Sequence, residues 1–147
     1  MITVVDQNTL EAALPLIRAY QTFYGCPAIS ADTNREHFRQ FGPDSEKGCL
    51  FLYTESGVAV AFATVYFTYS STLPGKVGVM NDLFTQEAYR GKGIGRKLID
   101  HCLSYATSQG AHRLQWLTAT RNETAQRLYD SLSVKKSDWH FYTYTGA

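Results

Sequence analysis

A glycine-rich stretch with several basic residues carries the most distinctive chemistry of this sequence. It reads Tyr89-Arg90-Gly91-Lys92-Gly93-Ile94-Gly95-Arg96-Lys97, and a helical spacing of apolar residues follows it directly. Its glycines let a ligand approach the backbone closely, and the N–H groups of a first helical turn bind anions. Counter-charge for a phosphate comes from four side chains, those of Arg90, Lys92, Arg96 and Lys97. The stretch therefore predicts a phosphate-binding turn.

Two familiar phosphate loops are excluded by their spacing. A Walker A loop needs Lys followed by Ser or Thr, whereas Lys92 precedes Gly93. The glycines also miss the dinucleotide pattern GxGxxG, and no acidic residue stands near position 115. The remaining interpretations are a pyrophosphate site without a hydrolytic apparatus, or a glycine turn that opens a helix with solvated basic residues.

The elements around this turn follow from hydrophobic periodicity and from turn residues. A strand over 2–5 precedes a helix capped by Asn8 or Thr9, in which Pro15 either kinks the helix or marks its first turn. The later elements are a helix from about 32 to 41, strands over 49–54, 58–68 and 76–85, a helix over 94–109, a strand over 114–120, a helix over 122–132 and a strand over 139–145. The order β-α-α-β-β-β-α-β-α-β predicts an α+β fold with a mixed sheet.

Length, composition and charge bound the class of protein. The chain has 147 residues, of which 44% are hydrophobic, so we expect a single folded domain over 1–147. Its net charge of +1 gives no general attraction for nucleic acid or an anionic membrane, which favours a small-molecule partner. We see no leader peptide or membrane span and therefore expect a cytoplasmic protein.

Cysteine and histidine spacing gives no indication of a metal. The sequence contains neither a CxxC pair nor an HExxH motif among Cys26, Cys49, Cys102, His37, His101, His112 and His140. We therefore expect neither a disulfide framework nor a bound metal ion.

Three ordered motifs resemble those of the GNAT superfamily of N-acetyltransferases. The acyl-CoA signature of the superfamily is similar to residues 90–95, and Asn81-Asp82-Leu83-Phe84 and residues 122–129 match in place and spacing. Within the superfamily, residues 66–72 and 138–141 resemble the diamine (spermidine/spermine) and thialysine acetyltransferase branch, with similarity from about 49 to 144. The resemblance implies a GNAT-type fold, acetyl-CoA as cosubstrate, a primary amine as acceptor and a homodimer.

The resemblance also implies which residues bind acetyl-CoA. The pantetheine arm and the acetyl carbonyl would meet the backbone of Leu83, Phe84 and Thr85. The pyrophosphate would meet backbone N–H groups of Arg90, Gly91, Lys92, Gly93, Ile94, Gly95 and Arg96. Asn122 would contact the pantetheine or a strand, although it is also a suitable helix N-cap. Tyr129 would lie near the CoA sulfur and return a proton to the thiolate, although it also fits as a core aromatic.

The proton acceptor is the point at which the sequence departs from this branch. An alkylammonium with a pKa of about 10.4 is neutral only about once in a few thousand molecules at pH 7. The branch usually has Glu before the Asp, but this chain has Asn81, which takes no proton and is left as a substrate contact. Asp82 replaces that Glu only if a β-bulge re-aims it, since consecutive strand residues point to opposite faces.

Several roles for Asp82 therefore stay open: catalytic base, amine-binding charge, or a capping or salt-bridging carboxylate. The alternative bases are His140, a water chain or the substrate itself. Tyr66, Tyr69, Trp116 and Trp139 form either an aromatic wall for a cationic acceptor or ordinary core packing. We expect an enzyme acting on a small diamine, polyamine or lysine-like amine. The alternatives are a protein-lysine or N-terminal acetyltransferase and a catalytically silent acyl-CoA-binding module.

Overall fold

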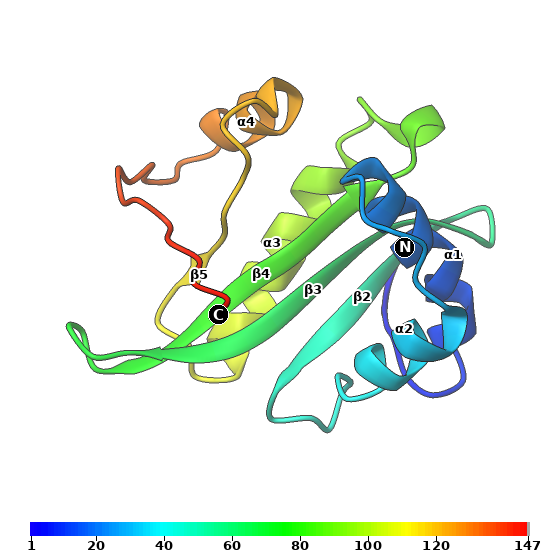
Figure 1. Cartoon of the computed structure of the whole chain (residues 1–147), viewed down its shortest axis with the longest axis horizontal. Coiled ribbons are helices and arrows are strands. Elements are labelled where there is room, and N and C mark those ends of the chain that lie inside the picture. Colours follow the sequence, from blue (N-terminus) through cyan, green and yellow to red (C-terminus); the bar gives the residue numbers. More distant parts are fainter. Residues whose placement is uncertain (147) are drawn as a thin grey trace. The chain divides into compact units, whose positions relative to one another are not determined.

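The helices and strands follow the predicted order up to the last helix (Figure 1). The computed structural model describes residues 1–146 and divides at Leu117 into two units. The first unit contains β1 (Ile2–Val4), α1 (Leu10–Phe23), α2 (Ala31–Phe38), β2 (Gly48–Glu55), β3 (Val58–Ser70), β4 (Gly75–Thr85), the short helix η1 (Glu87–Tyr89), α3 (Ile94–Ser108) and β5 (Leu114–Gln115). The second, from Thr118 onward, contains α4 (Glu123–Asp130).

The five strands form one mixed sheet in the order β1-β2-β3-β4-β5. Neighbouring strands from β1 to β4 are antiparallel, whereas β4 and β5 are parallel. A parallel pair needs a crossover connection, and α3 provides it. The predicted α+β fold with a mixed sheet is therefore confirmed.

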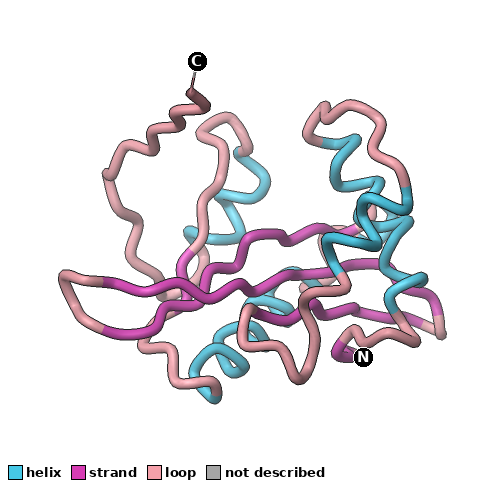
Figure 2. Tube along the Cα trace, turned by 60° about the horizontal axis from the view of Figure 1, so that its bottom comes forward, coloured by secondary structure: helices cyan, strands magenta, loops and turns pink. Residues whose placement is uncertain are grey.

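Helices cover both faces of the sheet (Figure 2). Successive strand residues point to opposite faces, so buried apolar side chains lie on each face and both need a cover. Leu52, Phe62 and Phe84 belong to the core shared with α1 and α2. Phe51, the neighbour of Leu52, points the other way and packs its ring 5.1 Å from that of Tyr105 on α3. The α1 and α2 face and the α3 face are thus separate surfaces of one sheet.

The turn between β2 and β3 has the conformation that its residues favour. Ser56 and Gly57 both have positive φ angles, of 50° and 79°. Two central residues of this kind are typical of a tight hairpin turn, in which glycine is favoured. The strands predicted over 49–54 and 58–68 are thus joined by a tight hairpin turn at Ser56-Gly57.

Two predicted strands differ from the structure. Residues 139–145 form no strand, although their alternating pattern favours one, and Trp139 and Tyr144 are 89% and 94% exposed. A strand needs a partner edge for its backbone hydrogen bonds, and the described residues 139–145 pair with none of the five strands of the sheet. The strand predicted over 114–120 is limited to β5, whose pairing with β4 ends at Val79, two residues before a bulge at Asn81. Such a bulge bends its strand and interrupts regular pairing.

Helix ends also differ by a few residues from the predictions. α2 ends at Phe38, a few residues before the predicted end near 41, and α4 covers Glu123–Asp130 within the predicted 122–132. Pro15 lies inside α1, beyond the first turn, where its missing N–H costs one hydrogen bond.

Candidate active site

The glycine-rich turn leads from η1 into α3 through two left-handed residues. Gly91 and Gly93 have φ angles of 77° and 80°, a conformation that favours glycine. The N–H of Lys97 donates to the Gly93 carbonyl, so the preceding N–H groups of the first turn have no partner within the helix. A side chain at either glycine would meet no protein atom within 4 Å. The turn therefore combines N–H groups that have no partner within the helix with open space beside both glycines, two features that suit an anion site.

The basic side chains of the turn differ in their contacts: one is bonded to the backbone, one lies near a carboxylate and one is exposed. Arg90 donates from Nε to the Thr85 carbonyl at 2.9 Å, and its guanidinium lies 5.4 Å from the ring centre of Phe23. Lys92 lies 4.0 Å from the Glu55 carboxylate, at the limit of an ion pair. Arg96 is exposed on the first turn of α3. Arg90 thus ties the turn to the end of β4.

The adjacent end of β4 presents backbone groups on the side away from β3. Gln86 donates its N–H to Val60, which makes this pair hydrogen-bonded in the antiparallel ladder. Such pairs alternate along a ladder, so Phe84 bonds toward β3 while Leu83 and Thr85 direct their N–H and C=O groups to the other edge. Since β5 pairs with β4 only at Gly78 and Val79, this edge is not covered by β5.

A β-bulge lies on β4 directly before these residues. Thr64 pairs with Asp82, but the next residue of β3, Val65, pairs with Met80, which leaves Asn81 as the extra residue. Met80 and Asp82 are therefore both buried, although their side chains lie on opposite faces of the sheet. Asp82 can replace the missing Glu only if a β-bulge lies here. The structure contains that bulge.

A hollow of about 340 Å³ lies between the sheet and the helices α1 and α2. Both Asn81 and Asp82 line it, together with Ile17, Tyr20, Gln21, Ile29, Thr33, Asn34, His37, Phe38 and Tyr66. Asp82 is the one carboxylate among these described lining residues, which include no lysine or arginine. An amine bound there would meet a negative charge without a competing positive one.

The Asp82 carboxylate is buried and held by two hydrogen bonds. Its side chain is 7% exposed, and its two oxygens accept from Oγ1 of Thr64 at 2.6 Å and from Nδ2 of Asn81 at 3.1 Å. A buried charge requires such partners. Asn81, which stands where the related branch has Glu, therefore orients the carboxylate of Asp82.

Tyr66 and His37 lie together on the wall of the same hollow. The Tyr66 hydroxyl is 3.5 Å from Nε2 of His37. Burial, and to a smaller extent the negative charge of Asp82, raise the pKa of Tyr66 above its ordinary value of 10. The phenol therefore keeps its proton at physiological pH and can donate a hydrogen bond.

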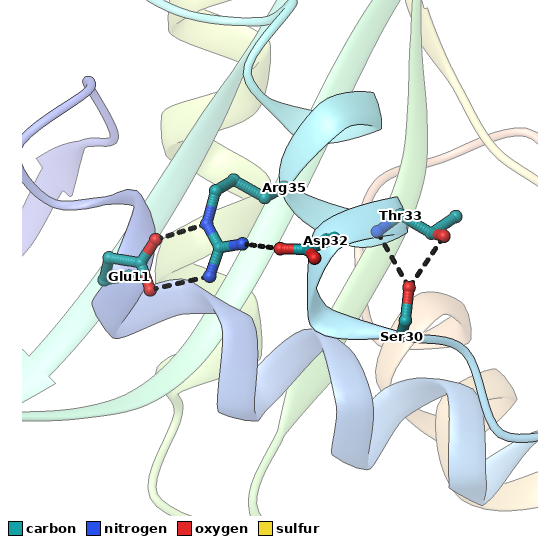
Figure 3. Close-up of polar contacts among 5 residues, drawn as sticks. All are labelled: Glu11, Ser30, Asp32, Thr33 and Arg35. Atoms are coloured by element: carbon teal, nitrogen blue, oxygen red, sulfur yellow. Dashed lines mark hydrogen bonds and ion pairs between the residues drawn. The ribbon is translucent and has the colours of Figure 1, made fainter.

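The helical wall of the hollow is held by polar contacts between α1 and α2. Gln21 and Asn34 exchange two amide hydrogen bonds of 2.8 and 3.0 Å, and Asn34 is 5% exposed. Arg35 of α2 bonds to both carboxylate oxygens of Glu11 on α1 and also to Asp32, while Ser30 caps α2 (Figure 3). These contacts fix the helix that carries His37.

The other residues singled out by sequence lie away from this hollow or in the second unit. Tyr69 pairs with Lys76 near the tip of the β3–β4 hairpin and is 75% exposed, and neither it nor Trp116 lines the hollow. Asn122 is the N-cap of α4, with its Oδ1 accepting from the N–H of Ala125 at 3.2 Å. Tyr129 is carried by α4.

No sequence pattern singled out the residues that α1 and α2 contribute to the hollow. Gln21, Asn34 and His37 belong to helices that were predicted only by their apolar spacing. The available signal was positional: Ile17 and Gln21, or Asn34 and Phe38, are four residues apart and thus lie on one helix face. That spacing indicates a shared face but not what the face covers.

The part of the chain that the structure describes shows neither a metal-binding cluster nor a membrane-crossing helix. Nowhere in residues 1–146 do three or more His, Cys, Asp or Glu side chains gather as a metal would require. None of the described helices has the length and apolar character needed to cross a membrane.

Comparison with known proteins identifies the class to which this fold and site belong. Residues 14–133 match the Acetyltransferase (GNAT) family. The D-amino-acid N-acetyltransferase HPA3 of Saccharomyces cerevisiae is 32% identical over 140 residues, which cover 92% of this chain and 84% of the yeast protein. The chain therefore belongs to the GNAT family, and it is an N-acetyltransferase.

Further relatives confirm the resemblance noted in the sequence. The thialysine N-epsilon-acetyltransferase of Bos taurus is 30% identical over 91 residues, which cover 59% of this chain and 53% of the bovine protein. The structure of AAC(6')-Iy in complex with the bisubstrate analog CoA-S-monomethyl-acetylneamine superposes with a TM-score of 0.82 at 18% identity, covering 100% of this chain and 98% of that one. The latter likeness concerns the fold.

Proposed function

We propose that this protein transfers the acetyl group of acetyl-CoA directly to a primary amine of a small diamine, polyamine or lysine-like acceptor. The observation that carries the proposal is the buried carboxylate of Asp82 in the hollow beside the bulge. An ammonium group is strongly attracted to a carboxylate in such a poorly hydrated place. The bulge at Asn81 directly precedes the stretch of β4 that β5 does not pair, so an amine at Asp82 would lie near the backbone groups assigned to the acetyl donor.

In this proposal the acetyl donor lies along β4 and the glycine-rich turn. Outward backbone groups of Leu83 and Thr85 suit the amide-bearing pantetheine arm, whereas the backbone groups of Phe84 are directed toward β3. Backbone N–H groups from Arg90 to Arg96 suit the pyrophosphate. From the resemblance, Asn122 contacts the pantetheine and Tyr129 returns a proton to the thiolate.

The acceptor enters the hollow with its amine toward Asp82. Tyr66 supplies an aromatic wall next to the cation, and Asn81 lies at the entrance. The relatives by name act on amino acids: a D-amino acid in the yeast protein and thialysine in the bovine one. Because their sequences are 32% and 30% identical to this one, the acceptor class is inferred chiefly from the hollow.

The size and charge of the hollow favour a small-amine acetyltransferase over two other functions: acetylation of a protein, and acyl-CoA binding without catalysis. A hollow of about 340 Å³ fits a small amine, whereas a protein acceptor needs an extended binding surface. A silent acyl-CoA-binding module has no need of a buried carboxylate facing an open hollow. A cytoplasmic location and a homodimer stay predictions, for which sedimentation of the purified protein is the direct test of oligomeric state.

Free thiol release from acetyl-CoA tests the proposal. The panel comprises diamines, polyamines, lysine analogues, amino acids and basic peptides at pH 7 and pH 9. Turnover with one small amine class supports the proposal and identifies the acceptor. Turnover only with basic peptides would favour a protein acceptor, and acetyl-CoA binding without turnover on any amine would favour the silent module.

A further inference from the structure

We infer that Tyr66 and His37 form the route by which the acceptor ammonium loses its first proton, while Asp82 holds the cation. The inference rests on the proposed function, because it concerns an amine bound in the hollow. It gives His37, on a helix remote in sequence from the family motifs, a defined part in the reaction.

The three side chains reach the hollow from three different elements. His37 comes from α2, Tyr66 from β3 and Asp82 from β4. The imidazole packs edge-on against Phe38 and Phe41 at ring distances of 4.8 and 5.4 Å, and its Nε2 lies 3.5 Å from the Tyr66 hydroxyl. The Phe41 ring also lies 4.5 Å from that of Tyr66, so aromatic contacts hold both partners.

A carboxylate is the weaker candidate for the proton acceptor. The equilibrium constant for proton transfer from an alkylammonium is about 10⁻⁴ when the acceptor is an ordinary imidazole. It is only about 10⁻⁶ when the acceptor is an ordinary carboxylate. Both oxygens of Asp82 already accept a hydrogen bond, from Thr64 and Asn81. The charge of Asp82 suits it to holding the cation, and imidazole as a side-chain type is the better proton acceptor.

Tyr66 has the properties of a neutral relay between the amine and His37. Its hydroxyl stays protonated, since burial and the Asp82 charge raise its pKa. It can pass its proton to the imidazole while it receives one from the ammonium. His37 itself is exposed at the rim, so it can release the proton to bulk water.

The side chains that surround His37 come from the sheet, from α1 and from α2 itself. The facing residues from β3 and β4 are Tyr66 and Asp82, and α1 contributes Tyr20 to the same hollow. The charged neighbours on α2 bond away from the imidazole, to carboxylates or guanidinium groups: Arg35 bonds to Glu11 and Asp32, and Glu36 pairs with Arg39 at 2.8 Å.

The proposed sequence balances protons and bonds. The ammonium gives one proton through Tyr66 to neutral His37, which releases it to water. The neutral amine then attacks the thioester carbonyl, so that the new C–N bond forms and the C–S bond breaks. The nitrogen loses its second proton as the CoA thiolate gains one, which leaves an amide, free CoA thiol and one proton in solution.

Kinetics of His37→Gln and Tyr66→Phe between pH 6.5 and 9.5 test the inference. We expect kcat/KM for the amine to fall about 100-fold at pH 7 in either variant. The loss should shrink to about five-fold or less at pH 9.5, where far more of the amine is already neutral. The KM for acetyl-CoA should not change, and added imidazole should restore part of the activity of His37→Ala at pH 7.

The matched control is His112→Gln, an exposed histidine in the loop before β5 that does not line the hollow. It should retain the wild-type pH profile. A loss of equal size at pH 7 and pH 9.5, or none at pH 7, would overturn the role of His37. Wild-type protein that releases no thiol with any amine at any pH would instead overturn the proposed function, and the inference with it.

Discussion

The glycine-rich turn at residues 89–97 and the hollow beside Asp82 are built in opposite ways. The turn is one continuous segment whose function depends on backbone N–H groups and two left-handed glycines. The hollow is assembled from α1, α2, β3 and β4, and it depends on particular side chains. A local site of the first kind leaves its pattern in the sequence, whereas an assembled site of the second kind does not.

This difference corresponds to the two substrates of the proposed reaction: the turn binds the acetyl donor and the hollow binds the amine acceptor. The proposed donor is acetyl-CoA whatever the acceptor, whereas the acceptor differs between relatives named for thialysine and for D-amino acids. Substitutions in the turn should therefore affect the donor, and substitutions around the hollow should affect the acceptor. The predictions below separate the two effects.

The largest effect on acetyl-CoA binding should come from Gly93→Asp in the turn. The substitution puts a side chain on a residue with φ of 80° and a negative charge where the pyrophosphate is placed. Acetyl-CoA affinity, measured by calorimetry, should fall about 100-fold. The matched control is Gly110→Asp, which has a similar φ of 88° at the far end of α3 and equally open surroundings. If both variants lost affinity equally, backbone strain rather than the anion site would be responsible.

A smaller effect should come from Asn34→Ala in the wall of the hollow. The change removes both amide hydrogen bonds to Gln21 and leaves that amide unpaired, which should lower the free energy of unfolding by about 1–2 kcal/mol. Urea denaturation measures this. The KM for the amine should rise, whereas the KM for acetyl-CoA should stay at the wild-type value.

The double variant Gln21→Leu/Asn34→Leu sharpens this prediction. Replacing both amides with apolar groups leaves no unpaired partner, so part of the lost stability should return. A double variant less stable than Asn34→Ala would show that the amide pair is not the source of the effect.

The smallest effect should come from Arg35→Gln, which breaks the contacts with Glu11 and Asp32. These groups are exposed, and the midpoint of thermal unfolding should fall by less than about 2 °C at pH 7. The hydrogen bond and charge of Arg35 lower the pKa of Glu11 below its ordinary value of 4.5. The stabilisation is thus complete above about pH 4.5 and disappears as the pH falls through the lower folded-state value.

Thermal unfolding of wild type and Arg35→Gln at pH 7 and pH 3 checks the sign. The difference between them should be smaller at pH 3. A difference that grows on acidification would contradict the assigned ion pair.

Much of the fold could be predicted because its signals are local. The β2–β3 turn, the Gly91 and Gly93 turn and the Asn122 cap each depend on neighbouring residues. The strand predicted over 139–145 was wrong because alternation indicates a strand only where a partner edge exists. The short β5 likewise reflects the bulge at Asn81, a property of the ladder and not of the β5 residues.

The candidate site could be predicted in part for the same reason. Asp82 and Tyr66, both named from the sequence, line one hollow, but only the register shift opposite Thr64 shows that Asp82 faces the α1 side. His37 and Asn34 depend on how α1 and α2 pack on the sheet, which no local pattern determines. Tyr69 has the residue type of an aromatic wall but lies near the hairpin tip.

Asp82→Asn provides the most direct test of the central claim that the hollow binds the amine separately from the donor. Asparagine keeps the shape and an oxygen acceptor for Thr64 but removes the charge. Initial rates of thiol release, with both substrates varied, should show kcat/KM for the amine reduced at least about 100-fold. The KM for acetyl-CoA should equal that of the wild type. Unchanged amine kinetics, or an equal loss for both substrates, would contradict the account.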